Sequence, residues 1–347
     1  MEKGISGQEA KYRPTIGVLG SGAIGGFYGM MLARAGFAVH FLLRGDYETV
    51  ARNGLHLRSA QYGDVDLNTA HIYRRADQMP KCDWILVSTK TTGNLALAPK
   101  IAECAAPGAR ILVLQNGLDV EDQIRPALPD SMHVVGGVCY ICAQRVAPGV
   151  IEHQALGAVH LGYHSGPAAT TAEKQAILAE GASLFRTAGV EAEVVTDLST
   201  ERWRKLLSNV PFNGLSVLLD SELKQLASDQ DSSRLALDMM RELMACGEKL
   251  GYRLPSEMPQ RALTQAASIP DYRPSMYQDY INHRPMELDA IYAAPLAAAA
   301  EAGCSMPKVE ALYQALRFID ARNNHDGGEH GGGEPEQQDE PKAALVN

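Results

Sequence analysis

The chain has little positive charge and lacks any long apolar run. Its 347 residues contain 32 Lys and Arg against 41 Asp and Glu, which gives a formal net charge of −9. A nucleic-acid-binding surface needs the opposite sign, so nucleic acid is not expected as a partner. No apolar stretch is long enough to span a bilayer, and we expect no membrane contact.

Cysteines and targeting signals are also scarce. Residues 1–9 are polar and contain no apolar segment of the signal-peptide kind, which predicts a cytoplasmic protein. Six cysteines in a chain of this length favour reduced thiols over a disulfide framework. Cys139 and Cys142 form a CxxC motif without a second Cys or His pair at zinc-finger spacing. We interpret this pair as structural, with a redox role or metal binding as the alternative, and we predict no metal site.

The pattern of expected elements changes near residue 197. Short β-rich runs alternate with helical patterns over 14–197, which predicts an α/β fold: a Rossmann-type, doubly wound and mostly parallel sheet. Its segment 136–162 is expected to add antiparallel strands at one edge. Only helical patterns follow over 198–323, which predicts an all-α second domain. The polar residues 1–13 and the acidic tail 324–347 are expected to be disordered. The expected strands are 15–19, 38–43, 84–88, 111–114, 134–138, 151–153, 159–163 and 192–195.

A glycine-rich turn follows the first expected strand and precedes a helix. Gly20 permits the tight turn, Gly22 leaves room for a pyrophosphate, and Gly25 lets the helix pack close to the sheet. The helix N-terminus then presents free N–H groups to the phosphates. This context predicts a dinucleotide site rather than a turn without a ligand. The motif comprises Gly20, Ser21, Gly22, Ala23, Ile24 and Gly25.

Arg44 ends the second expected strand, at the place where an acid would bind the ribose of NAD. The nearest acid, Asp46, lies beyond it. An arginine here can hold the 2′-phosphate of NADP, so we predict NADP(H) as the cofactor. The alternative is that Arg44 is a surface charge at a strand end.

Two further strand ends carry polar groups. Lys90 follows the strand 84–88, and Asn116 follows the strand 111–114. Ligands of doubly wound sheets bind at these ends, so Lys90 can reach a cofactor or a substrate carboxylate, and Asn116 can bond beside a nicotinamide. The alternatives are a solvated lysine and an ordinary Asn-Gly turn.

The second domain begins with a polar stripe in apolar sequence. Lys205, Asn209 and Asn213 are spaced by four residues, so they share one face of a helix. A buried lysine is costly unless it is paired. The stripe therefore predicts a catalytic lysine with two asparagine ligands, and its alternative is an exposed polar face.

A third cluster contains Ser275 and Glu287. Pro285 predicts a helix start that places Glu287 in the first turn, where the helix dipole favours an acid without any catalytic purpose. Asp289, two residues further on, is the alternative acid for any role assigned to Glu287.

Together, in this order and over about residues 15–320, these clusters resemble the ketopantoate reductase (2-dehydropantoate 2-reductase) family. The resemblance implies a Rossmann domain joined to a helical domain, with NADPH as hydride donor and a 2-oxo acid as the small-molecule substrate. It implies that Lys205 is the general acid. Substrate contacts would come from Asn116, Asn209, Asn213, Ser275 and Glu287, with Glu287 on the C4 hydroxyl. Lys90 and Asn116 would lie on the cofactor side.

The sequence departs from the family pattern at several places. Asn213-Gly214-Leu215 stands where Asn-Pro-Leu is common, Asp220–Leu223 replaces an Asn-rich turn, and 138–153 carries Cys-Tyr-Ile-Cys instead of small polar residues. These departures bear on the substrate more than on the reaction. We therefore keep two alternatives to ketopantoate reduction: a reductase of another branched 2-oxo acid or related carbonyl, and a non-catalytic NADP-binding sensor. A homodimer is compatible with the helical domain, but no residue pattern identifies an interface.

Overall fold

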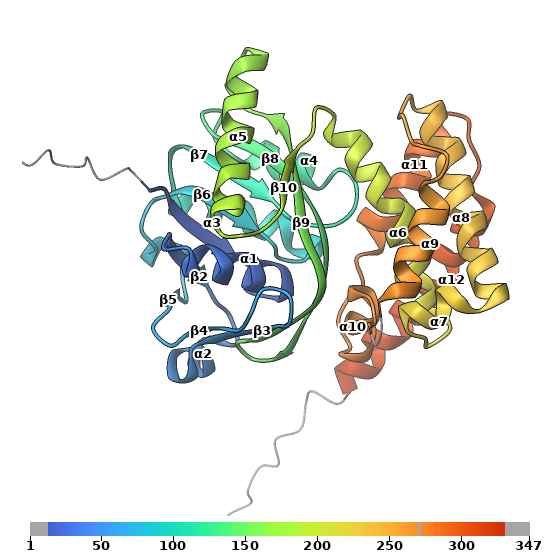
Figure 1. Cartoon of the computed structure of the whole chain (residues 1–347), viewed down its shortest axis with the longest axis horizontal. Helices are drawn as coiled ribbons and strands as arrows, with labels where there is room; N and C mark the ends of the chain where they lie inside the picture. The colour runs from blue at the N-terminus through green and yellow to red at the C-terminus, as the bar shows by residue number, and fades with distance from the viewer. Residues whose placement is uncertain (1–12, 270–271, 330–347) are drawn as a thin grey trace, which may run out of the picture.

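The computed structural model describes residues 13–269 and 272–329, and it has two parts, a sheet-containing part and a helical part (Figure 1). The strands are β1 (Thr15–Leu19), β2 (Ala38–Leu42), β3 (Leu55–Ser59), β4 (Val65–Leu67), β5 (His71–Tyr73), β6 (Cys82–Val87), β7 (Ala105–Val113), β8 (His133–Ala147), β9 (Val150–Ser165) and β10 (Ala192–Val194). The helices of this part are α1 (Ala23–Arg34), α2 (Tyr47–Asn53), α3 (Asn94–Cys104), α4 (Val120–Ile124) and α5 (Thr171–Thr187).

The strands form one mixed sheet in the order β4-β3-β9-β8-β7-β6-β1-β2-β5, with β10 beside β9. β1 pairs in parallel with β2 and β6, and β6 pairs in parallel with β7. Leu19 is in register with Val87, which is in register with Val113. Because these strands end together, the segments that follow them start side by side at one edge of the sheet.

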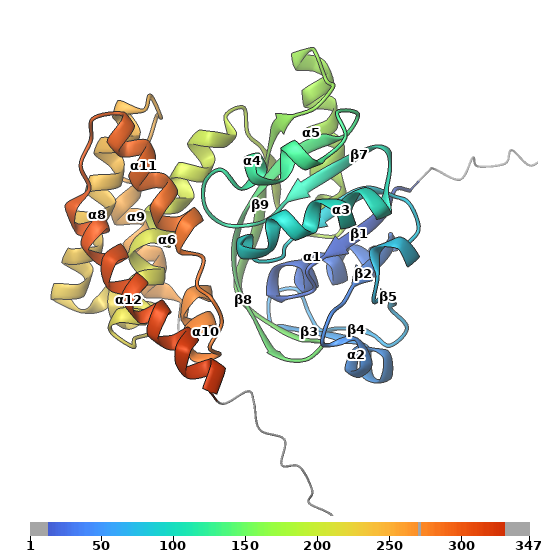
Figure 2. The same cartoon turned by 180° about the vertical axis from the view of Figure 1, so that it is seen from behind.

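Helices cover both faces of the sheet, as the opposite views in Figures 1 and 2 show. α1 and α5 pack on one face, with Phe27, Tyr28 and Phe185 among the buried residues. α3 and α4 pack on the other face through residues such as Ile101 and Ile124. With both faces covered, the central strands are buried and consist of nearly continuous apolar runs.

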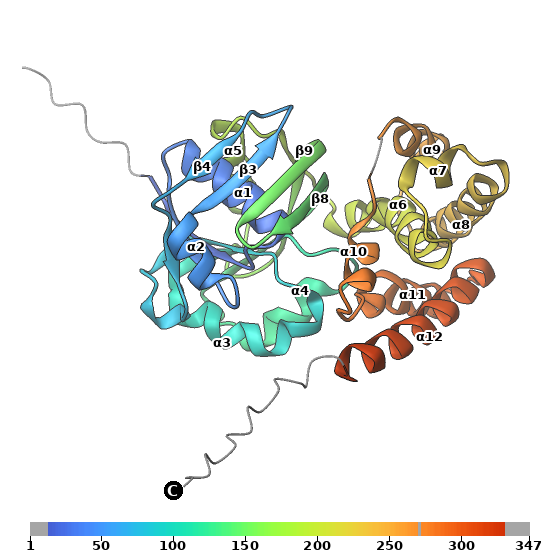
Figure 3. The ribbon, with the colours of Figure 1, turned by 90° about the horizontal axis from the view of Figure 1, so that it is seen from below.

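The helical part begins at α6, which lies between the sheet and the other helices (Figures 1 and 3). Asp197 caps this helix by accepting a hydrogen bond from Thr200 N at 3.1 Å. α6 contacts β9 on one side and α8, α10 and α12 on the other. The helices are α6 (Leu198–Leu218), α7 (Leu223–Ser228), α8 (Gln230–Lys249), α9 (Met258–Ser268), α10 (Ser275–Ile281), a π-helical turn (Asp289–Ala293), α11 (Ala294–Glu301) and α12 (Pro307–Glu329).

The antiparallel addition to the sheet is confirmed, but its expected place at an edge is wrong. β8 and β9 pair antiparallel over most of their length, and the two strands expected at 151–153 and 159–163 are one strand, β9. β3 pairs with β9, and β4 pairs with β3, so the sheet continues beyond the antiparallel pair. β3 was not predicted although its residues alternate between apolar and polar, and β4 is too short to give such a signal.

The expectation that all cysteines are reduced is also wrong. Cys246 of α8 and Cys304, between α11 and α12, form a disulfide across 58 residues. Cys82, Cys104, Cys139 and Cys142 are free and buried. The long separation explains why no local pattern indicated the bond.

The described residues include short parts of both terminal segments, whose disorder stays a prediction. Arg13 donates to the carbonyl oxygens of Ala35 and Gly36 at 3.1 and 3.0 Å. α12 continues to Glu329, past residue 324, where the acidic tail was expected to begin. Residues 1–12 and 330–347, also expected to be disordered, lie outside the described residues.

Every helix in the described ranges is too short or too polar to cross a bilayer.

Candidate active site

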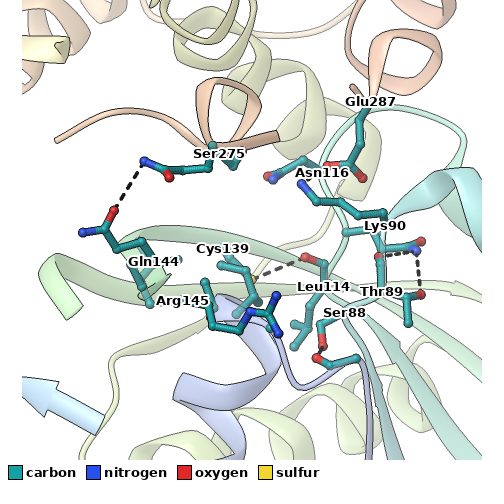
Figure 4. A pocket seen from close by; sticks show the side chains of 18 of the residues that line it. Ser88, Thr89, Lys90, Leu114, Asn116, Cys139, Gln144, Arg145, Ser275 and Glu287 are labelled. Atoms are coloured by element: carbon teal, nitrogen blue, oxygen red, sulfur yellow. Dashed lines mark hydrogen bonds and ion pairs between the residues drawn. The ribbon is translucent and has the colours of Figure 1, made fainter. Parts of the chain in front are cut away.

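A cleft of about 1830 Å³ lies between the carboxyl ends of β1, β6 and β7 and the helices α6, α9 and α10. Figure 4 shows part of it, with Lys90 and Glu287 on facing segments. The structure brings the predicted site residues together here, except for Gly25, which packs under the cleft. Those that line it are Gly20, Ser21, Gly22, Ala23, Ile24, Arg44, Lys90, Asn116, Lys205, Asn209, Asn213, Ser275 and Glu287.

The glycine turn has the shape that a pyrophosphate requires. Gly20 has a φ of 103°, and a Cβ there would lie 2.5 Å from Thr89 N. A Cβ on Gly22 would meet nothing within 4 Å, so the space beside its backbone is open. A Cβ on Gly25 would collide with Ser88 Oγ and Gly20 O, so this glycine allows α1 to approach the sheet.

Ser21 supports the same interpretation. Its Oγ is buried and has no hydrogen-bond partner among the described residues. Gly22 at the N-cap of α1 provides no side-chain cap, so the N–H groups of the first turn are free to bind an anion. An orphaned hydroxyl beside these groups fits the phosphates of a dinucleotide.

The surroundings of Arg44 fit a 2′-phosphate better than a free ribose hydroxyl. Arg44 is exposed at the cleft, and no described acid pairs with it. Asp46, the nearest acid in the sequence, pairs instead with Arg145 of β8. Arg74 also lines this end of the cleft, where it pairs with Glu48 and lies over the ring of Tyr47 at 4.2 Å. Arg44, in contrast, has no acid partner among the described residues, so its charge is available to a phosphate.

Lys90 connects the two parts of the molecule. Its Nζ lies 2.7 Å from Asp279 Oδ2 and 3.1 Å from Glu287 Oε2, while Thr91 N donates to Glu287 Oε1 at 3.0 Å. Asp279 also accepts from Arg284 Nε at 3.1 Å. Burial disfavours the charged lysine, but the two carboxylates outweigh it and raise the pKa of Lys90.

The expected helix start at Pro285 is wrong. Residues 284–287 are not helical, and Glu287 precedes the helical segment rather than standing in its first turn. Glu287 is buried, and Lys90 and Thr91 hold its carboxylate at the start of the helical segment, so these tertiary contacts act in addition to the helix dipole. Asp289 is exposed and does not line the cleft, so Glu287 is the acid at this position.

The loop that carries Asn116 is fixed on both sides. Gln115 Nε2 donates to Thr89 O at 2.8 Å and to Asn94 Oδ1 at 2.6 Å. Arg202 of α6 donates to the carbonyl oxygens of Gln115 and Gly117 at 2.9 and 3.2 Å. The side chain of Asn116 has no hydrogen bond to a described residue, so its amide is available in the cleft.

The polar stripe of α6 faces the cleft. Lys205 Nζ lies 4.8 Å from the ring centroid of Tyr140, and no described acid forms an ion pair with it. Burial lowers its pKa, although Cys142, Cys139 and Glu201 act in the opposite direction. A partly buried lysine without a carboxylate partner is well suited to donate a proton to a developing anion.

The two asparagines of the stripe are buried below Lys205. Asn209 Nδ2 has no hydrogen-bond partner among the described residues. Asn213 Oδ1 accepts from Met276 N at 3.5 Å, at the start of the helix that begins with Ser275. The stripe therefore offers a free amide donor beside the lysine.

Some residues of the cleft were not predicted. Asp279, Arg145, Tyr140 and Glu201 all line it. Asp279 stands four residues after Ser275, and Glu201 stands four before Lys205, so helical spacing was an available signal for both. Arg145 and Tyr140 come from β8, and no motif distinguishes them.

A glycine-rich turn on a Rossmann-type sheet, in one cleft with a lysine on the first helix of a second domain, is typical of a class of dinucleotide-dependent oxidoreductases. The chain belongs to the ketopantoate reductase family: the pattern described as Ketopantoate reductase PanE/ApbA matches residues 16–166, and its C-terminal pattern matches 197–320.

Individual relatives agree with this family. A 2-dehydropantoate 2-reductase from Nostoc sp. (strain PCC 7120 / SAG 25.82 / UTEX 2576) is 38% identical over 309 residues, which is 88% of this chain and 95% of the relative. The crystal structure of a 2-dehydropantoate 2-reductase from Geobacter metallireducens GS-15 is 34% identical with a TM-score of 0.79, covering 89% of this chain and 99% of that one. The corresponding enzyme structure from Methylococcus capsulatus is 30% identical with a TM-score of 0.76, covering 89% and 97%.

Proposed function

We propose that this protein reduces 2-dehydropantoate (ketopantoate) to (R)-pantoate with NADPH. The observation that carries the proposal is the position of Lys205, unpaired with any described acid, in the cleft that also contains the glycine turn. Family membership agrees with this reaction, since relatives that cover most of the chain are named 2-dehydropantoate 2-reductase.

NADPH, when bound, supplies the hydride for C2 of the substrate. We assign its pyrophosphate to the turn Gly20–Gly25 and its 2′-phosphate to Arg44, for which the open space at Gly22 and the orphaned Ser21 hydroxyl are the support. Asp46 is occupied by Arg145, which favours a phosphate over a free ribose at this end.

Lys205 is the proposed proton donor. Negative charge develops on the C2 oxygen of a 2-oxo acid as it is reduced, and an adjacent ammonium stabilises that charge and then transfers its proton. Because burial already lowers the pKa of Lys205, the proton leaves more readily than from a solvated lysine.

The remaining polar groups are assigned to the substrate. Asn209, with its free Nδ2, and Asn116, with its free amide, donate to the carboxylate and the carbonyl, and Asn213 and Ser275 complete this wall. Glu287 accepts the C4 hydroxyl, and Lys90 keeps its carboxylate in place. A homodimer and a cytoplasmic location stay predictions.

Reduction of a different branched 2-oxo acid is the second candidate. The cleft of about 1830 Å³ holds the dinucleotide as well as the substrate, so its volume is compatible with either acid. Cys-Tyr-Ile-Cys at 139–142 also lines the cleft where the family pattern has smaller polar residues.

The first experiment compares initial rates of NADPH oxidation with ketopantoate and with 2-oxoisovalerate, which lacks the hydroxyl. We expect a strong preference for ketopantoate, because a carboxylate placed for a hydroxyl is left unpaired by the analogue. Equal or slow rates would contradict this substrate and favour the second candidate. NADPH binding without turnover of any 2-oxo acid would indicate a sensor.

In parallel, Lys205→Ala should lower kcat by well over tenfold, and a smaller effect would refute its role as proton donor.

A further inference from the structure

Tyr140 of β8 contacts two charged residues of α6 at once. The face of its ring lies 4.8 Å from Lys205 Nζ, and its hydroxyl donates to Glu201 Oε1 at 2.8 Å. Glu201 and Lys205 are four residues apart on the same face of α6. The tyrosine therefore connects the two side chains although they form no ion pair with each other.

Glu201 is itself held from three elements. It is buried and accepts hydrogen bonds from Tyr140, from His160 Nδ1 of β9 at 2.6 Å, and from Arg204 Nη1 of α6 at 2.8 Å. Burial opposes the charge of Glu201, but the bonds from His160 and Tyr140 outweigh it and lower the pKa of this carboxyl. The other ring nitrogen of His160 lies 3.8 Å from the exposed Glu193. Glu201 is thus a fixed, charged anchor for the Tyr140 hydroxyl.

We propose that Tyr140 is a positioning residue for Lys205: the face of its ring holds the ammonium by a cation–π interaction, and Glu201 fixes the ring through its hydroxyl. This inference rests on the proposed role of Lys205 as proton donor.

The contact has a physical consequence for the reaction. An ammonium within 6 Å of an aromatic face is attracted to it, whereas a neutral amine is not, so the ring favours the protonated lysine. It also restricts a flexible side chain that has no described acid to orient it. The groups that face Lys205 are Tyr140, Cys139 and Cys142 from β8 and Glu201 from α6.

Tyr140 and Glu201 both favour the protonated form of Lys205. Burial and Glu201 strongly raise the pKa of the Tyr140 phenol, so the ring stays neutral and its hydroxyl stays a donor. Glu201 acts on Lys205 through its charge as well as through the ring, since it raises the lysine pKa against the effect of burial. Loss of either residue should therefore make Lys205 lose its proton at a lower pH.

The test compares Tyr140→Leu, Tyr140→Phe and Glu201→Gln in the full-length protein. We expect Tyr140→Leu to lower kcat for ketopantoate reduction by about 3- to 30-fold, the range for a cation–π contact. In this variant the alkaline limb of the pH profile of kcat should move to lower pH, because Lys205 carries the proton in the active form. Tyr140→Phe keeps the ring face and should recover most of kcat. Glu201→Gln should move the limb in the same direction.

A matched control is available away from the cleft. Lys174 Nζ lies 5.5 Å from the ring centroid of Tyr163, and neither residue lines the cleft. Tyr163→Leu removes a similar lysine–tyrosine contact and should change neither kcat nor the alkaline limb. Circular dichroism and NADPH binding check that each variant is folded.

A second readout does not depend on turnover. The pH dependence with which acetic anhydride labels Lys205, followed by mass spectrometry of its peptide, reports the protonation of this amine directly. Half-maximal labelling should occur at lower pH in Tyr140→Leu and Glu201→Gln than in the native protein. Unchanged labelling, or a Tyr140→Phe variant as impaired as Tyr140→Leu, would overturn the proposal. If ketopantoate is not reduced at all but the labelling shifts as expected, the proposed function fails and the positioning of Lys205 stands.

Discussion

Lys90 and Asp279 form an ion pair at 2.7 Å although 189 residues separate them in the sequence. The lysine follows β6 of the sheet, and the carboxylate belongs to α10 of the helical part. The same ammonium reaches Glu287 at 3.1 Å, so one cation of the first part holds two buried acids of the second. This contact crosses the cleft where the proposed substrate would bind.

Lys90→Met is expected to raise KM for ketopantoate about tenfold, because Glu287 loses the charged partner that orients it. The binding of NADPH should change much less. Steady-state kinetics and NADPH titration by fluorescence measure both constants. Lys81→Met, which alters an exposed lysine outside the cleft, is the control. A Lys90→Met variant with native KM would refute the role of this ion pair in substrate binding.

The difference in stability between Lys90→Met and the native protein should also depend on pH. Burial raises the pKa of Asp279, and Lys90 counteracts this effect, so without Lys90 the charged carboxylate becomes harder to accommodate. An acid with a raised pKa costs stability at pH values above that pKa, where it is ionised. The loss of stability in Lys90→Met should therefore be full at neutral pH. It should shrink as the pH falls through the raised pKa of Asp279, which lies above 3.8. If the idea were wrong, thermal melts would show the same difference in Tm between Lys90→Met and the native protein at every pH between 4 and 8.

Arg44→Ala should discriminate between the two nicotinamide cofactors. We expect KM for NADPH to rise about 10- to 100-fold, since a charged hydrogen bond is worth about 1.5–3 kcal/mol, while KM for NADH stays within about twofold. Arg52→Ala removes an exposed arginine of α2 that does not line the cleft, and it should affect neither cofactor. An equal loss for NADPH and NADH would contradict the assignment of Arg44 to the 2′-phosphate.

Local patterns were enough to predict the elements that depend on near neighbours in the sequence. The glycine turn at Gly20, the stripe of Lys205, Asn209 and Asn213, and the change to helices after residue 197 all have short-range signals. The family was predicted correctly from these motifs in combination.

The contacts that hold those motifs in place could not be predicted in the same way. The partners of Lys90, the pairing of Asp46 with Arg145, and the contact of Tyr140 with Lys205 each join segments that are far apart in the chain. Such contacts depend on the packing of whole elements, and a single sequence carries no periodicity for them. The disulfide of Cys246 has the same origin.

The disulfide between Cys246 and Cys304 should stabilise the helical part without affecting the reaction. Closing a 58-residue separation restricts the unfolded chain, so replacing both cysteines with alanine should lower the free energy of unfolding by about 2–4 kcal/mol. Urea unfolding of the double variant and of the dithiothreitol-reduced native protein should agree. Because neither cysteine lines the cleft, kcat and KM should stay native. A stability change below about 0.5 kcal/mol would contradict the prediction.

Asn209 offers a test in which stability and activity change in opposite directions. Its Nδ2 has no hydrogen-bond partner among the described residues, and an unpaired buried donor costs up to about 3 kcal/mol. Asn209→Leu removes this cost and should raise the free energy of unfolding by about 1 kcal/mol, measured by urea titration. Because the donor proposed for the 2-oxo acid is lost, KM for ketopantoate should rise at least about tenfold.

Asn94 is the matched control for this substitution. It is also buried, but its amide donates to Gln123 and accepts from Gln115, at 2.9 and 2.6 Å. Asn94→Leu breaks both bonds and should lower the free energy of unfolding by about 1–3 kcal/mol. If Asn209→Leu were destabilised to the same extent, the Asn209 amide would have a structural partner. If the free energy of unfolding instead rises in Asn209→Leu and falls in Asn94→Leu, Asn209 is a donor kept unpaired for a ligand at the expense of stability.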